Sequence, residues 1–209
     1  MSHKQPTLYI VVPCYNEEAV LAETAKQLSA KLQELVQKKQ IHSDSKIMFV
    51  NDGSKDQTWS KICDLHKKNS DIVGISLSRN RGHQNALLAG LMTAKTRADS
   101  VISMDADLQD DINVIDQMLE KYQDDAEIVY GVRSSRQKDS WFKRTTAGGF
   151  YKFMKLMGVD VIFNHADYRL TSRKVLDELE KYQEVNLFLR GIFPLIGFKT
   201  EVVYYERKE

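Results

Sequence analysis

The chain has 209 residues, of which 42% are hydrophobic and 28% are charged, and its formal net charge is +1. This composition fits one soluble α/β domain with a sizeable core, and it excludes a chain that binds nucleic acid through its overall charge. The two cysteines, Cys14 and Cys63, have no paired spacing, which argues against a disulfide scaffold or a zinc site and fits a reducing compartment.

Strand-like and helix-like stretches alternate along the chain. Residues 1–6 lack the apolar core of a signal peptide, and no segment approaches the ~20 apolar residues that span a bilayer. Apolar runs predict strands and helical spacing predicts helices. The predicted strands are residues 8–12, 47–50, 72–77, 101–104 and 128–132, and the predicted helices are residues 17–39, 54–66, 82–96 and 112–122. This rhythm predicts a mostly parallel sheet with helices on both faces.

The end of the first predicted strand lacks a glycine-rich phosphate loop. A dinucleotide-binding fold would place Gly-x-Gly-x-x-Gly there, whereas residues 12–18 read VPCYNEE. A tyrosine and a glutamate at this point suit stacking on a base and accepting its hydrogen bonds. The charge of a diphosphate would then fall to a metal ion. The alternative is a strand-ending turn with a helix cap.

Two aspartates follow the fourth predicted strand. In open α/β sheets ligands bind at the carboxyl ends of the strands. Side chains two residues apart on a strand point the same way, so Asp105 and Asp107 could share one hard cation that bridges nucleotide phosphates. A solvated acidic turn or helix-capping carboxylates are the alternatives.

Three motifs in this order resemble the family 2 glycosyltransferases of GT-A fold. They are residues 12–18, residues 50–58 (VNDGSKDQT) and residues 105–109 (DADLQ). The similarity is closest to the polyprenyl-phosphate glycosyltransferases, which include dolichol-phosphate mannosyltransferases and bacterial undecaprenyl-phosphate glucosyltransferases. Residues 78–84 (SRNRGHQ), 130–133 (YGVR) and 166–173 (ADYRLTSR) support it. The resemblance covers nearly the whole chain and implies a GT-A (Rossmann-like) fold.

The resemblance also implies a set of site residues. The implied nucleotide-binding residues are Pro13, Tyr15, Glu17, Val50, Asp52, Asp105, Ala106 and Arg133. The implied ligands of Mg²⁺ or Mn²⁺ are Asp105, Asp107 and Gln109. The implied catalytic residues are Asp107 and Asp167, with Arg169 and Arg190 in the acceptor or phosphate region.

Structural alternatives remain for several of these residues. Asp52 could merely form a turn before Gly53, and Arg133 could be a surface cation. We interpret His83 as structural, capping or orienting the helix that follows Gly82.

The implied activity is inverting transfer of a hexose from a nucleotide sugar to polyprenyl (undecaprenyl) phosphate, for cell-envelope glycan modification. The bacterial resemblance favours a UDP-sugar, and the implied place is the cytoplasmic face of the cell membrane. The acceptor phosphate is largely dianionic at neutral pH, because its second pKa is near ~6. Asp167 is therefore expected to orient the acceptor or a basic side chain, unless it is a structural ion-pair partner of Arg169 or Arg173.

Residues 133–155 mix basic and aromatic side chains. Such a stretch can lie on an anionic bilayer, or it can pack its aromatic rings into the core. The chain stops at residues 204–209, whereas similar proteins continue into a basic, glycine-containing segment and, in the membrane-bound ones, transmembrane helices. We therefore expect residues 1–209 to be a single catalytic domain without these parts, and we leave a homo-oligomer open.

Other functions remain as alternatives. A family 2 enzyme could act on a soluble saccharide or a wall polymer, and a related chain could bind nucleotide sugars without catalysis. A nucleotidyltransferase is disfavoured, because its glycine-rich basic loop is missing. A haloacid-dehalogenase phosphatase is disfavoured, because Gln109 stands where that class has Thr or Val.

Overall fold

The computed structural model describes residues 5–134, 165–182 and 188–206. Apart from residues 133 and 134, the basic stretch expected to meet a membrane lies outside these ranges. None of the helices within the described ranges has the length and the apolarity needed to cross a bilayer.

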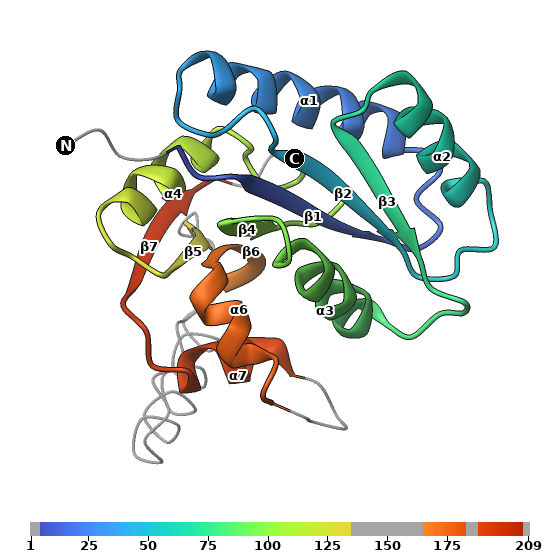
Figure 1. The fold of residues 1–209 in the computed structure, drawn as a ribbon. Coiled ribbons are helices and arrows are strands. Elements are labelled where there is room, and N and C mark those ends of the chain that lie inside the picture. Colours follow the sequence, from blue (N-terminus) through green and yellow to red (C-terminus); the bar gives the residue numbers. More distant parts are fainter. Residues whose placement is uncertain (1–4, 135–164, 183–187, 207–209) are drawn as a thin grey trace.

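A single seven-stranded sheet is the centre of the described fold (Figure 1). Its strands are β1 (Leu8–Cys14), β2 (Lys46–Asn51), β3 (Ile72–Ser76), β4 (Ser100–Ser103), β5 (Ile128–Arg133), β6 (His165–Ser172) and β7 (Thr200–Tyr205). They lie in the order β3-β2-β1-β4-β6-β5-β7. Strand β6 runs antiparallel to both of its neighbours, and every other pairing is parallel.

Helices cover both faces of the sheet and create two cores. The described helices are α1 (Leu21–Gln37), α2 (Thr58–Lys68), α3 (His83–Ala94), α4 (Val114–Gln123), α6 (Arg173–Leu179) and α7 (Leu189–Leu195). Helices α1, α2 and α4 pack on one face, and α3, α6 and α7 pack on the other (Figure 1). Strand β1 is buried on both sides because alternate residues, such as Ile10 and Val11, point into opposite cores.

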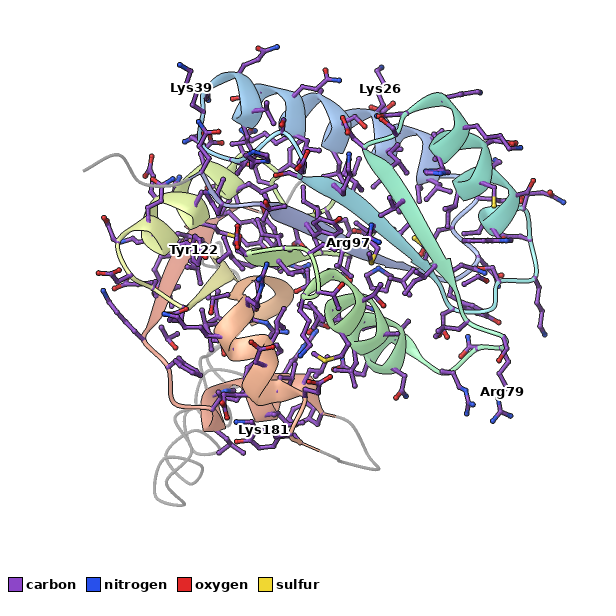
Figure 2. The ribbon with its side chains drawn as sticks, viewed as in Figure 1. Lys26, Lys39, Arg79, Arg97, Tyr122 and Lys181 are labelled. Atoms are coloured by element: carbon purple, nitrogen blue, oxygen red, sulfur yellow. The ribbon has the colours of Figure 1, made fainter. Side chains whose placement is uncertain are left out.

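Charged side chains on the outside of the fold project into solvent. Lys26 of α1, Lys39 after α1 and Arg79 between β3 and α3 point away from the fold (Figure 2). The two apolar layers hold the helices on the sheet.

The predicted alternation of strands and helices is confirmed for the first 134 residues. The five predicted strands correspond to β1–β5, and the four predicted helices correspond to α1–α4, with boundaries shifted by a few residues. Strand β6, helices α6 and α7, and strand β7 were not predicted. Strand β6 was missed because its sequence, HADYRLTS, lacks an apolar run, although it lies in the middle of the sheet.

Candidate functional site

A pocket with a volume of about 270 Å³ opens at the carboxyl ends of β1, β2 and β4. The lining residues that the sequence predicted are Pro13, Tyr15, Glu17, Asp52, Asp105, Ala106 and Asp107. The lining residues that it did not assign to a site are Cys14, Asn80, Gly82, His83 and Ala86. The parallel strands β1, β2 and β4 bring these segments together because their carboxyl ends meet at one edge of the sheet.

The loop after β1 presents an aromatic ring and a carboxylate to this pocket. Tyr15 is half-exposed and Asn16 has a left-handed backbone conformation, with φ of 56°. The backbone N–H of Asn16 donates to Ser54 Oγ at 3.0 Å, and that of Glu17 donates to Thr58 Oγ1 at 2.9 Å. These bonds fasten the β1 loop to the β2 loop. Partial burial and the nearby negative charges of Asp107 and Asp105 raise the pKa of Glu17.

Asp52 is buried and supports the pocket wall. Its Oδ1 accepts from the backbone N–H of Arg81 at 2.7 Å, and its Oδ2 accepts from that of Gly82 at 2.9 Å. The neighbouring Gly53 has φ of 64°, and a Cβ there would lie 2.5 Å from the backbone nitrogen of Asn80. Asp52 therefore does more than form a local turn, because it holds the segment 80–82, about thirty positions away, in which Asn80 and Gly82 line the pocket.

We expect Asp52→Ala to weaken nucleotide binding even without a divalent cation. The change removes the carboxylate that accepts from two backbone N–H groups. A hydrogen bond to a charged group contributes about 1.5–3 kcal/mol to stability, so the pocket wall should be held less firmly. Calorimetric titration with UDP in EDTA measures the effect, and Asp52→Asn, which keeps one acceptor oxygen, should show a smaller loss. If Asp52→Ala changes only the cation-dependent part of binding, Asp52 belongs to the cation site instead.

The acidic loop, residues 104–113 between β4 and α4, carries the predicted metal ligands. Asp105 is partly buried, and burial raises its pKa; His83 opposes this shift, and the negative charges of Asp110 and Asp107 add to it. Asp107 is exposed, and its Oδ1 accepts from the backbone N–H of Gln109 at 3.1 Å. The Gln109 side chain does not line the pocket.

These residues fit a hard divalent cation that arrives with its nucleotide. No three His, Cys, Asp or Glu side chains converge into a complete metal site within the described ranges. A Mg²⁺ site commonly consists of one or two carboxylates, with waters and substrate phosphates completing the coordination. The raised pKa values of Glu17 and Asp105 reflect burial and the negative charges nearby, and a bound cation would offset that negative charge.

Asp167, on β6, is buried in a charged network beside the pocket. Arg190 of α7 donates to both of its oxygens, with Nε–Oδ1 and Nη2–Oδ2 distances of 3.1 Å each. His83 Nε2 lies 3.1 Å from Asp167 Oδ2 and 4.0 Å from Asp105 Oδ1. Although burial opposes it, hydrogen bonding to His83 and Arg190 holds the pKa of Asp167 well below its usual range.

His83 links the two sides of the site, which the sequence did not reveal. We interpreted it as a structural residue at the start of α3, and it does begin that helix. It also lines the pocket between Asp105 and Asp167, and the hydrogen bond to Asp167 raises its pKa. A signal for this role was present in the sequence, because His83 is the one histidine of the SRNRGHQ stretch that supports the family resemblance.

The remaining predicted residues lie around the pocket rather than in its lining. Val50 is fully buried in the core beneath α3. Arg169 is also fully buried, with its guanidinium 3.6 Å from the centroid of the Phe193 ring. It does not pair with Asp167. Arg173, the other proposed partner, instead forms a salt bridge with Asp99, which precedes the amino-terminal end of β4.

Arg133 ends β5 and pairs with a buried carboxylate in the acidic loop. Its side chain is 28% exposed, and its Nη2 donates to Asp110 Oδ1 at 2.8 Å. It is therefore not a free surface cation, and its position near donor phosphates stays a prediction.

The sequence motifs and the fold agree with the comparison with known proteins. Residues 9–180 match the family model of glycosyl transferase family 2. The chain belongs to this family. It is 56% identical over 209 residues to the uncharacterized glycosyltransferase YkoT of Bacillus subtilis, covering 100% of this chain and 62% of the relative. It is 40% identical over 201 residues to the bactoprenol glucosyl transferase of Shigella phage SfV, covering 96% and 63%. The chain thus spans about three fifths of the length of these curated relatives.

Solved structures confirm the predicted GT-A fold. The mannosyltransferase PcManGT of Pyrobaculum calidifontis, in complex with GDP-Man and Mn²⁺, superposes with a TM-score of 0.66 at 18% identity, over 97% of this chain and 57% of that chain. Glucosyl-3-phosphoglycerate synthase of Mycobacterium tuberculosis, in complex with Mn²⁺, UDP-glucose and phosphoglyceric acid, gives 0.58 at 16% identity, over 98% and 73%.

Proposed function

We propose that this chain transfers a hexose from a nucleotide sugar to a polyprenyl phosphate at the cytoplasmic face of a membrane. The observation that carries the proposal is one pocket that joins Tyr15 and Asp52 to the Asp105–Asp107 pair, with the Asp167–Arg190 pair adjoining through His83. The relative named bactoprenol glucosyl transferase supports a glucosyl donor and a polyprenyl acceptor. The resemblance of the sequence motifs to bacterial undecaprenyl-phosphate glucosyltransferases favours UDP as the nucleotide.

Asp105 and Asp107 would hold Mg²⁺ or Mn²⁺ against the donor diphosphate. The Mn²⁺ complexes of the two solved structures support this part of the proposal. When bound, such a cation offsets the negative charge that builds on the nucleoside diphosphate as it leaves. Tyr15 would stack on the base, because its half-exposed ring lines the pocket, and Asp52 would keep the segment 80–82 in position.

The acceptor phosphate needs little help from a base. As a monoester it is largely dianionic at neutral pH, since its second pKa is near ~6. Asp167 has a lowered pKa and both oxygens engaged by Arg190, so it is a weak proton acceptor. We infer that it orients Arg190 and His83 toward the acceptor phosphate. That phosphate attacks the anomeric carbon opposite the leaving diphosphate, which inverts the configuration.

A donor screen tests the proposed function. UDP-sugars and GDP-sugars are titrated with Mg²⁺ or Mn²⁺ while the unfolding temperature is followed. A ligand at 100 times its Kd should add about 2.7 kcal/mol to the free energy of unfolding. Stabilisation by a nucleotide sugar that requires the cation supports the proposal. If no nucleotide sugar stabilises the chain at millimolar concentration, the proposal is contradicted.

Residues 133–155 carry the membrane part of the proposal. We expect the chain to sediment with vesicles of anionic lipid at low salt and less at high salt, because exposed charges are screened within ~8 Å at physiological ionic strength. Replacing Lys143 and Arg144 with Gln should reduce sedimentation and leave donor affinity unchanged. The matched control replaces Lys26 and Lys39 with Gln. Both lysines are exposed, one on α1 and the other just after it. No sedimentation at low salt would contradict this contact.

A further inference from the structure

A buried carboxylate lies behind the metal-site aspartates in the acidic loop. Asp110 is 2% exposed, and its Oδ1 accepts from Tyr205 Oη at 2.5 Å and from Arg133 Nη2 and Nε at 2.8 and 3.1 Å. A buried carboxylate is costly unless it is paired and hydrogen-bonded, and these donors offset that cost through Oδ1, whereas Oδ2 is buried without a hydrogen-bond partner among the described residues. Burial and the bond to Asp110 raise the pKa of Tyr205, which keeps its hydroxyl protonated as a donor.

The donors come from strands that meet beneath the loop. Arg133 and Tyr205 are the last residues of β5 and β7, and they are direct neighbours in the parallel pairing of these strands. Tyr168 of β6 packs edge-on against the Tyr205 ring, with centroids 5.5 Å apart, and its hydroxyl donates to the carbonyl of Asp111 at 3.1 Å. Three strands therefore hold the second half of the acidic loop.

The first half of the same loop carries the residues that face the pocket. Asp105 and Asp107 flank Ala106, whose carbonyl accepts from Thr24 Oγ1 of α1 at 2.6 Å. The stretch that bears both carboxylates is thus fastened at Ala106 and again at Asp110. Groups that fix first-sphere ligands typically control metal affinity, because a ligand that can drift does not bind a cation with defined geometry.

We propose that Asp110, Arg133 and Tyr205 form a positioning cluster that holds the acidic loop in the conformation that binds the cation and the donor diphosphate. This inference rests on the proposed function. Tyr205 lies beyond residues 9–180, so strand β7 completes the donor site from outside the segment that matches the family. Arg133 acts here through Asp110, from the back of the loop.

Tyr205→Phe tests the cluster by removing a single hydroxyl. We expect affinity for UDP measured with Mn²⁺ to fall about tenfold, the lower end of the loss typical for groups that support metal ligands. Affinity measured in EDTA should not change. Tyr204→Phe is the matched control, because Tyr204 is the preceding residue on β7 and is 69% exposed. Asp110→Asn, which removes the charge, should weaken Mn²⁺-dependent affinity further.

The outcomes separate this inference from the proposed function. A Tyr205→Phe variant with a lower unfolding temperature but wild-type affinity for UDP with Mn²⁺ would overturn the positioning role. Equal losses with Mn²⁺ and in EDTA would also overturn it, because the cluster would then support the whole pocket. A wild-type chain that binds neither UDP nor GDP with Mn²⁺ would overturn the proposed function and this inference with it.

Discussion

Asp107→Asn is expected to abolish cation-dependent binding of the nucleotide sugar while the chain stays folded. The substitution keeps the size of the side chain and removes one charge from a proposed cation ligand. A hard cation prefers carboxylate ligands, and an uncharged amide attracts it less, so affinity measured with Mn²⁺ should fall on the order of 100-fold. The fold should survive because Asp107 is exposed and its contact with the Gln109 N–H can be kept by the asparagine carbonyl.

Calorimetric titration of UDP-glucose with and without Mn²⁺ measures this effect. Asp44→Asn is the matched control, because it removes the same charge from an exposed residue. Asp44 precedes the amino-terminal end of β2, whereas the pocket lies at the carboxyl ends of the strands. The control should bind like the wild type. Wild-type affinity in Asp107→Asn would rule out the metal assignment.

The second large effect is expected at the Asp167–Arg190 pair. Asp167→Asn and Arg190→Ala should each lower turnover by on the order of 100-fold and leave donor affinity nearly unchanged, because neither residue lines the donor pocket. The two changes combined should cost little more than one, since groups that act as a unit are not additive. Arg173→Ala is the control, because it breaks an Arg–Asp contact before the amino-terminal end of β4. Additive losses would contradict a shared role.

The pH dependence of stability gives an independent check of the same network. The pKa of Asp167 is lowered in the folded state, so its contribution is complete above the unfolded value of about 4 and is lost as pH falls through the folded value. The pKa of His83 is raised by its hydrogen bond to Asp167, so its contribution is complete below about 6.5 and is lost as pH rises through the folded value. The wild type should therefore exceed Asp167→Asn in stability most clearly between about pH 4 and 6.5. The charged groups around this contact are Arg190 of α7, Asp105 of the acidic loop and the buried Arg169 of β6.

Much of the pocket lining could be predicted from local sequence, because each of its motifs spans only a few residues. An apolar run followed by Asp105 and Asp107 identifies both a strand and the residues at its carboxyl end. The parallel pairing of β1, β2 and β4 then brings Tyr15, Asp52 and these aspartates to one edge without any long-range contact that the sequence would have to reveal.

The contacts that bury Asp167 and Asp110 could not be predicted in the same way, because their partners are distant in sequence. Asp167 lies on a polar strand that gives no apolar signal, and it pairs with residues 23 and 84 positions away. From the sequence, Asp110 resembles a solvated carboxylate in an acidic turn. In the structure it is buried and accepts hydrogen bonds from Arg133 and Tyr205, which lie 23 and 95 positions away at the ends of two strands.

The most direct test of the proposed function is transfer of labelled hexose under single-turnover conditions. The chain, in excess over labelled UDP-glucose, is mixed with Mg²⁺ and anionic vesicles that contain polyprenyl phosphate, and the label is extracted into organic solvent. An excess of chain keeps slow turnover measurable, and Asp107→Asn provides the blank. We predict that label enters the organic phase only when the cation and the polyprenyl phosphate are both present. Label that appears only in water-soluble saccharides, whatever lipid is supplied, would contradict the account.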